Sequence, residues 1–423
     1  MTKRKRYFRL FPEVIYVPGV VGSALYLLLQ QKVFALDLLR SQILAYTEQN
    51  YSLEQAANQI GLSLPETEKF LDALNNLGAG CFLEQPCFVE KIRPFNPVED
   101  ITFFRPAPKI NILHINLTSQ CSQDCIFCEP GKFTPRLQPC LGCRRELAGR
   151  EQILPFHYIK KALEETALLG CHSIVFHAGD PHITEELLSD TILNACKLNY
   201  NMFELITGTP LAKGLIKQLT KMKITPVFQI FSDQEAVHDH ISGKKGNWAQ
   251  LMQNIFFLKK NDYPFKLVYL FAGEDPDPYR VLANLNKLGP EAVYSDRLLK
   301  NSPPVKDFIY GENYLTPPDI GRYISKQKNH TCLHGKLALN WDGKYYPCPA
   351  FLGHELGHVR ETTVQEIFAE KKNLQYWQSN NEQETCFKCE FRFACHRCEA
   401  LFLQCEDKTL ICGNNAMLIA NRA

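Results

Sequence analysis

Three cysteines in one short run constrain this chain more than any other feature of its sequence. Cys121, Cys125 and Cys128 are separated by three and then two residues, just after an apolar run at 110–117 that predicts a buried strand. Thiolates are the natural ligands of iron–sulfur clusters, and four are normally used. A loop that offers three leaves one iron open, much as catalytic zinc keeps an open position for substrate. The spacing alone also permits a zinc knuckle or scattered core cysteines.

The other cysteines point to metal ligation in a reducing compartment. The chain has 17 cysteines in 423 residues, and many form pairs separated by two residues. They are not distributed along the chain as in a disulfide framework. Its length predicts two to four domains. The net charge of +2 gives no general sign of binding to nucleic acid or to a membrane surface. We expect a cytoplasmic protein without a membrane segment.

The middle of the chain alternates between strand-like and helix-like stretches up to about residue 300. Helical patterns such as 156–169 and 248–260 separate the strands. Such alternation predicts a parallel sheet or barrel covered by helices, with functional residues at the carboxyl ends of the strands. The predicted strands are 110–117, 172–177, 202–207, 224–230, 265–271 and 292–294.

The cysteine loop follows the first of these strands, and this arrangement resembles the radical S-adenosylmethionine (radical SAM) superfamily. Phe127, just before the last cysteine, also matches the family pattern. The resemblance implies a partial (β/α)6 barrel over residues 98–300. It also implies that a 4Fe–4S cluster on Cys121, Cys125 and Cys128 binds S-adenosylmethionine and cleaves it to a 5′-deoxyadenosyl radical.

Further motifs resemble the family at the ends of later strands. The run 178–181 stands where the family has Gly-Gly-Glu-Pro, although Ala178 and Asp180 depart from that motif. The resemblance assigns cofactor contacts to Phe127, Gly179, Asp180, Pro181, Thr207, Ser232 and Asp233. By itself, Gly-Asp-Pro is an ordinary turn, so the position after a strand gives the match its weight.

A run that begins at His238 and Asp239 resembles the His-Asp-x-x-Arg-Gly-x-x-Gly-x-Phe pattern of family members that modify peptides and proteins. Ser242 replaces the arginine of that pattern, so any contact of that charge with a carboxylate must come from elsewhere. As isolated residues, His238 and Asp239 are more typical of a helix start than of catalysis.

The pattern of strand-like and helical stretches in residues 1–97 predicts a separate small domain. Two strand-like stretches, 7–17 and 24–36, precede three helical stretches, and Ser52 with Gln55 and Ser63 with Glu66 form capping-box patterns. This is a small winged-helix arrangement of the α+β class. It resembles the peptide-recognition element of ribosomal-peptide maturation enzymes, akin to the chaperone of pyrroloquinoline quinone biosynthesis, in which a leader peptide adds a strand to the sheet edge.

A DNA-binding winged helix is the alternative for this domain. Its third helix carries Glu66, Glu68 and Asp72 against one lysine, Lys69. Such a face suits a phosphate backbone poorly, so we expect no nucleic-acid partner.

The last part, 301–423, contains Cys332 and Cys348 and then four cysteines spaced C-x2-C-x5-C-x2-C from Cys386 to Cys398. This pattern resembles the SPASM domain, an auxiliary-cluster module of radical SAM enzymes. The resemblance assigns one 4Fe–4S cluster to Cys386, Cys389, Cys395 and Cys412. It assigns a second cluster to Cys332, Cys348 and Cys398, for which the sequence shows no fourth cysteine just before Cys332. That cluster therefore has an open iron in this reading, and Cys405 could replace Cys412. A structural zinc site is the alternative.

One insertion, at 129–150, carries Cys140 and Cys143. This pair could form a disulfide, supply metal ligands to another cluster, relay a hydrogen atom or be two inert thiols. The sequence leaves these alternatives open.

Together these features predict a radical SAM/SPASM maturase of a ribosomally made peptide that forms a C–S or C–C cross-link. Its partners would be a precursor peptide, held by the N-terminal domain, and a low-potential electron donor such as flavodoxin or ferredoxin. One alternative keeps the chemistry but modifies a larger protein, as in sulfatase activation or quinohaem enzyme maturation. Another is a non-enzymatic winged-helix protein that carries zinc.

Overall fold

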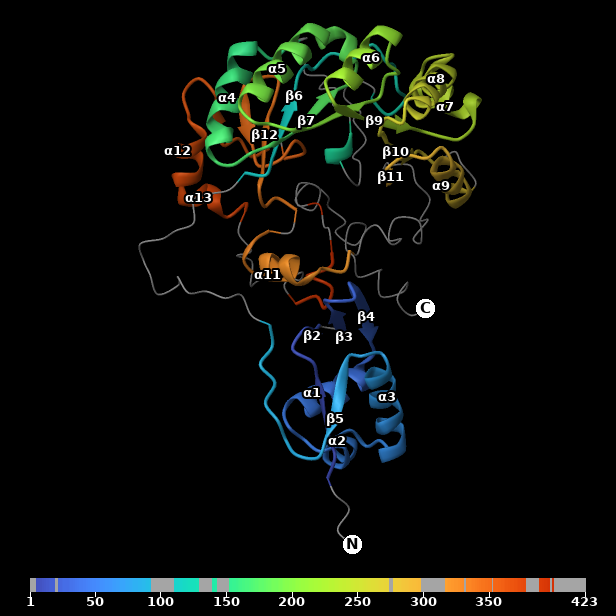
Figure 1. Ribbon diagram of the computed structural model, residues 1–423, viewed down its shortest axis with the longest axis vertical. Helices are drawn as coiled ribbons and strands as arrows, with labels where there is room; N and C mark the ends of the chain where they lie inside the picture. The colour runs from blue at the N-terminus through green and yellow to red at the C-terminus, as the bar shows by residue number, and fades with distance from the viewer. Residues whose placement is uncertain are drawn as a thin grey trace.

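Three sheets organise the protein. The structure, a computed structural model, describes residues 5–19, 22–92, 110–128, 139–142, 152–273, 277–297, 316–330, 332–351, 353–377, 388–395 and 398. Within these residues there is one sheet of nine strands, one of three and one of two. Figure 1 shows the large sheet with its helices at one end of the molecule and an N-terminal unit at the other. The predicted domain boundaries near 97 and 300 both lie outside the described residues.

The N-terminal unit breaks each of its two predicted strands into two. A turn after Phe11 interrupts the first, and a turn at 28–31, in which Gln31 has a φ of 49°, interrupts the second. The order of elements is β1 (Tyr7–Leu10), β2 (Val14–Pro18), β3 (Ser23–Leu27), β4 (Lys32–Leu36), α1 (Leu38–Glu48), α2 (Leu53–Ile60), α3 (Leu64–Asn76) and β5 (Gly80–Leu83). β2, β3 and β4 form an antiparallel sheet, and β1 pairs with β5.

The predicted helices of this unit are confirmed, and their caps explain where they begin. Both α2 and α3 start with a full capping box, in which the serine side chain accepts from the third backbone N–H and the third side chain accepts from the serine N–H. These bonds satisfy donors that a helix start leaves without partners. Phe8, Leu25, Leu44 and Leu71 are among the buried residues that join the helices to the strands.

Six parallel strands form the body of the large sheet, as the sequence predicts. They are β6 (Ile112–Asn116), β7 (Ser173–Ala178), β8 (Met202–Thr207), β9 (Ile224–Ile230), β10 (Lys266–Phe271) and β11 (Ala292–Arg297). The helices that follow them are α4 (Phe156–Leu168), α5 (Glu185–Lys197), α6 (Lys213–Lys221), α7 (Glu235–Ser242), α8 (Asn247–Lys260) and α9 (Pro278–Lys287). Parallel neighbours need such crossover connections, and the α/β class is confirmed.

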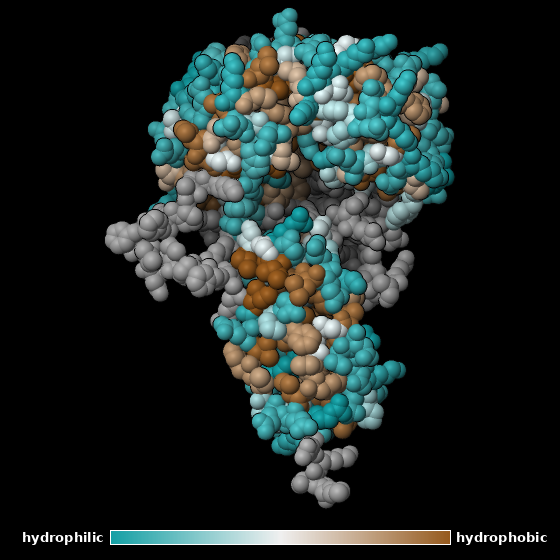
Figure 2. Space-filling model, in the orientation of Figure 1, coloured by the Kyte–Doolittle hydropathy of each residue, from teal (hydrophilic) through white to brown (hydrophobic). Residues whose placement is uncertain are grey.

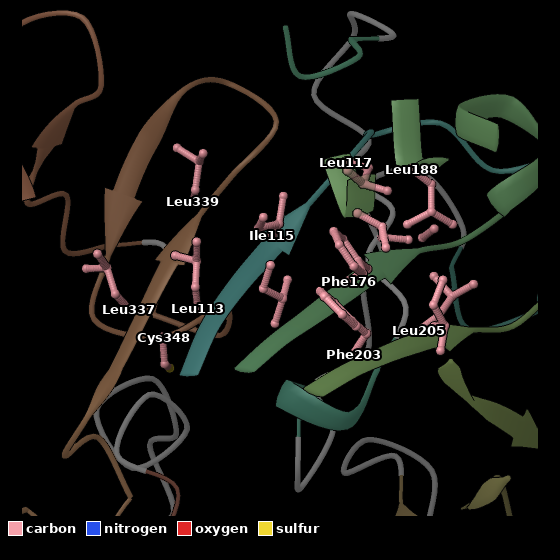
Figure 3. Close-up of a cluster of buried hydrophobic side chains, with 14 of the residues drawn as sticks. Leu113, Ile115, Leu117, Phe176, Leu188, Phe203, Leu205, Leu337, Leu339 and Cys348 are labelled. Atoms are coloured by element: carbon pink, nitrogen blue, oxygen red, sulfur yellow. The ribbon is translucent and has the colours of Figure 1, made fainter. Parts of the chain in front are cut away.

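Alternate residues of these strands serve two different faces. Leu113, Ile115, Phe176 and Leu205 belong to the cluster in which the helices cover the sheet, and Figure 3 shows several of these side chains. The other face carries a smaller cluster that includes Val175, Ile206, Val227 and Val268. Because strand side chains alternate, one strand can pack the outer core and line the inner face at the same time.

The C-terminal part extends the same sheet, which the sequence did not predict. β12 (Lys336–Leu339) pairs in parallel with β6, and the antiparallel strands β13 (Lys344–Tyr346) and β14 (Gly357–His358) follow. The helices α11 (Ile320–Lys328), α12 (Val364–Ala369) and α13 (Lys371–Leu374) complete this part. This pairing places the segment that carries Cys332 and Cys348 beside β6, the strand that leads into the Cys121 loop. No helix in the described ranges is long and apolar enough to span a bilayer.

Candidate active site

The predicted cysteine loop leaves the carboxyl end of β6. Cys125 and Cys128 are buried, and Cys121 is half-buried. The loop is held by its own turn, in which Cys128 N donates to Cys125 O at 2.8 Å, and by Ile126 N, which donates to Ile241 O at 3.0 Å. The three cysteines therefore sit in a folded loop that backbone bonds attach to α7.

Gly179, at the end of β7, lies directly against this loop. A Cβ atom on Gly179 would lie 2.7 Å from the Sγ of Cys121, so only glycine fits beside that thiol. The next residue, Asp180, accepts a hydrogen bond from the hydroxyl of Ser122. Gly243, directly after α7, makes a similar approach, because a Cβ there would overlap the backbone oxygen of Asp124.

Two threonines, one at the end of β8 and one just after it, fix the carbonyl of Gly179. Thr209 Oγ1 donates to Gly179 O at 2.6 Å, and Thr207 Oγ1 accepts from Thr209 N at 3.0 Å. Gln123 in the cysteine loop donates to Thr209 Oγ1 at 3.3 Å and to Asn247 Oδ1 at 3.4 Å. The ends of β7 and β8 and the start of α8 are thus tied to the loop. Gln123, Thr209 and Asn247 were not among the predicted site residues.

An aromatic series covers the buried side of the loop. The ring centroid of Phe127 lies 5.5 Å from that of Phe231, which lies 5.0 Å from that of His238. Phe231 N donates to His238 Nδ1 at 3.2 Å. Asp239 accepts from the backbone N–H groups of Gly246 and Trp248. The helix-start interpretation of these two residues is wrong, because both lie within α7; Asp239 instead holds the backbone N–H groups at the start of α8.

Burial lowers the pKa of His238 from 6.5 to about 4, and the nearby Asp239 only partly offsets this effect. His238 is therefore neutral in the folded protein, whereas the unfolded chain binds an additional proton between pH 6.5 and pH 4. Stability from this site is present above pH 6.5 and is lost as the pH falls towards 4. A shift of this size corresponds to about 3 kcal/mol.

We therefore expect the change in unfolding free energy between pH 7 and pH 4.5 to be smaller for His238→Asn than for the wild type. Denaturant titrations of both proteins at several pH values would measure it. Equal pH dependence in the two proteins would contradict the assignment.

The remaining predicted cofactor contacts have different surroundings. Pro181 is buried at the start of a short 3-10 helix, η2 (Pro181–Thr184). Ser232 is buried, and its hydroxyl accepts from Gln234 N at 3.1 Å. Asp233 forms an ion pair with Arg280 of α9 at 3.0 Å. Asp233 thus links the end of β9 to α9, and its predicted contact with a cofactor stays a prediction.

The inner face of the sheet carries polar residues that the sequence analysis missed. His114 Nδ1 lies 3.0 Å from His177 Nε2, and both side chains are buried. Asn116 Nδ2 donates to Asn340 Oδ1 at 2.7 Å, across the junction of β6 with the C-terminal part. The alternation within 112–116 could have predicted this face, because His114 and Asn116 stand at every second position.

The C-terminal cysteines fall into two separate neighbourhoods. Lys336 Nζ lies 3.7 Å from Cys332 Sγ, and the thiols of Cys348 and Cys398 also raise the pKa of Lys336. Cys389 and Cys395 instead act on Tyr26 of β3, whose pKa is raised first by burial and then by these thiols. The two neighbourhoods hold members of different predicted ligand sets, and the assignment of these ligands to clusters stays a prediction. The other predicted ligands, Cys386 and Cys412, lie outside the described residues, as do Cys143 and Cys405.

The N-terminal sheet packs directly on the Cys389–Cys395 segment. Tyr26 Oη donates to Glu390 O at 2.7 Å, and Arg392 donates to Pro18 O at 3.3 Å. Phe391 and Ala394 share a hydrophobic cluster with residues of β2 and β3 and with Tyr323 of α11.

The donor chemistry of these cysteine sets fits iron–sulfur clusters. Among the described residues, no three His, Cys, Asp or Glu side chains are grouped to hold one metal ion. In a 4Fe–4S cluster each thiolate binds a different iron, so its ligands need not converge on one point. The glycine approach to Cys121 and the all-cysteine donor sets fit such clusters.

Comparison with known proteins agrees with this geometry. Residues 115–285 match the model of the radical SAM superfamily, and residues 332–390 match the SPASM iron–sulfur cluster-binding domain. The chain therefore belongs to the radical SAM enzymes that carry a SPASM domain. A curated relative, a GTP 3′,8-cyclase from Clostridium botulinum, is 25% identical over 114 residues, which are 27% of this chain. The match covers 32% of that relative, so the chain spans about a third of its length.

Two solved structures share the fold at low sequence identity. The crystal structure of Streptococcus suis SuiB bound to precursor peptide SuiA has a TM-score of 0.51 and 13% identity, and the match covers 95% of this chain and 98% of that chain. The structure of anSMEcpe with bound AdoMet has a TM-score of 0.53 and 15% identity, with 75% and 99% covered. Because the SuiB match spans almost the whole chain, it extends the shared fold to the N-terminal unit.

Proposed function

We propose that this enzyme modifies a ribosomally synthesised precursor peptide and forms a C–S or C–C cross-link in it. One observation carries the proposal: the N-terminal sheet is packed on the segment with Cys389 and Cys395, through the Tyr26–Glu390 bond. A peptide held by this unit would be anchored to the part of the chain that carries the auxiliary ligands. The SuiB likeness, with a precursor peptide bound to that protein, supports the same role for this fold.

Cys121, Cys125 and Cys128 would hold the cluster that binds S-adenosylmethionine. When bound, these groups supply a 5′-deoxyadenosyl radical that abstracts a hydrogen atom from the peptide. The protein's part is to position the reacting groups and to exclude water. Gly179 fits this role because its backbone lies against Cys121, and its carbonyl is fixed by Thr209.

Removal of a hydrogen atom and closure of a cross-link leave one electron to be accepted. Cys386, Cys389, Cys395 and Cys412, and the set around Cys332, would hold auxiliary clusters that accept it. We further propose a low-potential flavodoxin or ferredoxin as the electron donor and the cytoplasm as the location. Radical SAM chemistry needs potentials near the bottom of the range of about −700 to +450 mV open to iron–sulfur clusters.

The edge of β4 is the proposed docking line for the leader peptide. β4 pairs with β3 on one side, and no further strand pairs with it among the described residues. Exposed leucines lie at both ends of β4: Leu29 is 67% exposed and Leu38 is 62% exposed. Hydrophobic side chains also gather near β2 and β3 on the face in Figure 2. An edge strand with apolar side chains beside it suits recognition by strand addition.

We expect Leu38→Asp to weaken binding of the precursor peptide by about tenfold or more. Burial of one leucine contributes about 1.5–3 kcal/mol, and 1.4 kcal/mol is a factor of ten in affinity. Fluorescence anisotropy with a labelled leader peptide would measure the effect. Leu168→Asp is a matched control, because Leu168 is 87% exposed at the end of α4. Equal losses in both variants would contradict a leader site at β4.

Reaction of the reconstituted enzyme with candidate precursor peptides would test the function itself. We expect 5′-deoxyadenosine and a peptide that has lost the mass of two hydrogens. The alternative, a larger protein substrate, predicts that no short peptide binds the N-terminal unit. Modification of a folded protein without any leader would favour that alternative.

A further inference from the structure

One predicted auxiliary ligand lies against a lysine of β12, and two more are buried in the core to which β12 belongs. Lys336 Nζ lies 3.7 Å from Cys332 Sγ. Cys348 and Cys398 are 3% and 8% exposed and belong to the same hydrophobic cluster as Leu337, the neighbour of Lys336. Figure 3 shows Cys348 with Leu113 and Leu337 of the paired strands β6 and β12. The site is therefore built at the junction of the barrel sheet and the C-terminal part.

Part of the insertion after the Cys121 loop reaches this junction. Cys140 lies in the 3-10 helix η1 (Pro139–Leu141). Leu141 and Gly142, the next two residues, hold this turn against the inner face of the sheet. Leu141 packs against the cluster that contains Val175 and Val227, and Ile112 of β6 packs against the same cluster. Gly142 O lies 3.0 Å from Nδ1 of the buried His177. These contacts fix where Cys140 sits.

The strand register places the η1 turn beside the auxiliary cysteines. Ile112 of β6 packs against the same small cluster as Leu141 and is the partner of Lys336 in the β6–β12 pairing. Lys336 Nζ in turn lies 3.7 Å from Cys332 Sγ. Cys140, the neighbour of Leu141, therefore lies at the junction that carries the auxiliary ligands.

We propose that Cys140 is the fourth thiolate of the auxiliary cluster held by Cys332, Cys348 and Cys398. This inference rests on the proposed function, because it requires an iron–sulfur cluster at that site. It assigns a ligand from the insertion at 129–150 to a cluster of the C-terminal part. It also replaces the expectation of an open iron there, since four thiolates are the usual complement.

The assignment has a consequence for the cluster's role and for Lys336. With four protein thiolates, this cluster has no free position for a substrate thiolate and is suited to electron transfer. The ammonium of Lys336 offsets part of the negative charge that four thiolates bring into a largely buried site. The insertion would then connect the SAM-binding loop, which ends at Cys128, directly to an auxiliary cluster.

The test uses the full chain with Cys121, Cys125 and Cys128 replaced by alanine, so that only auxiliary clusters remain. After anaerobic reconstitution we expect this parent to hold about 8 iron atoms, two cubane clusters. Cys140→Ala, Cys140→Ser, Cys143→Ala and Cys196→Ala are then made in it. Cys196 is an exposed residue of α5 and is the matched control. Iron and sulfide content, EPR after mild oxidation and reduction potentials are measured.

We expect Cys140→Ala either to lose about half of the iron or to give a [3Fe–4S] EPR signal on oxidation, because a three-thiolate cluster releases its exposed iron. Cys140→Ser should keep the iron and change the potential of one cluster, since an oxygen ligand can replace sulfur. Cys143→Ala and Cys196→Ala should match the parent.

Parent-like iron, EPR and potentials in both Cys140 variants would overturn the inference. The same changes in Cys143→Ala alone would also overturn it, because they would assign the ligand to Cys143. If Cys140→Ala loses both clusters, the potentials of Cys140→Ser decide: one altered cluster supports the assignment, and none overturns it. A parent without auxiliary iron would instead contradict the proposed function.

Discussion

Alanine at Cys121, Cys125 or Cys128 is expected to reduce 5′-deoxyadenosine formation to the background of a protein-free reaction. Each substitution leaves two thiolates in the loop, so one iron of the cluster loses its protein ligand. Two of these side chains are buried, and the loop is bonded to α7 through Ile126 and Ile241. We therefore expect no other cysteine to move in as a substitute. Chromatography of reactions with S-adenosylmethionine and a strong reductant would measure the product.

Cys196→Ala is the control for this prediction, because that thiol is exposed on α5 and is not one of the predicted cluster ligands. It should cleave S-adenosylmethionine at the wild-type rate. A reconstituted Cys125→Ala protein that still forms 5′-deoxyadenosine would show that the cluster is held elsewhere.

The sequence predicted local features well because their causes are local. The cysteine spacing, the capping boxes at Ser52 and Ser63 and the six parallel strands each follow from residues close together in the chain. The break at 28–31 was missed, since an apolar run does not reveal where a strand turns back on itself. There the φ of 49° at Gln31 is a conformation that few residues prefer.

Features that depend on distant pairing could not be predicted from the sequence. The β6–β12 pairing joins residues more than 200 positions apart, and no local pattern identifies the partner of an edge strand. The position of Cys140 near the auxiliary ligands depends on that pairing, because it brings β12 beside the inner face of the sheet, where Leu141 packs. The ion pair of Asp233 with Arg280 is another distant pairing that no local pattern reveals, and the cofactor contact that the family resemblance assigns to Asp233 stays a prediction.

A methyl group at Gly179 should remove the SAM-binding cluster and spare the others. The new Cβ of Gly179→Ala would lie 2.7 Å from the Sγ and 2.9 Å from the Cβ of Cys121. The backbone of Gly179 cannot easily retreat, because Thr209 Oγ1 holds its carbonyl at 2.6 Å. The clash therefore displaces the thiol of Cys121. We expect iron to fall from about 12 to about 8 atoms per chain, three cubanes to two, together with loss of S-adenosylmethionine cleavage.

Gly214→Ala is the matched control, because a Cβ at that position of α6 would meet no atom within 4 Å. Alanine there should leave iron content and cleavage unchanged and stabilise the helix by up to about 1 kcal/mol. The pair thus separates steric displacement of one ligand from any general effect of replacing glycine. If Gly179→Ala kept all its iron and its activity, Cys121 would have to bind the cluster from a different position. The contact between the end of β7 and the cysteine loop would then have no part in holding the cluster.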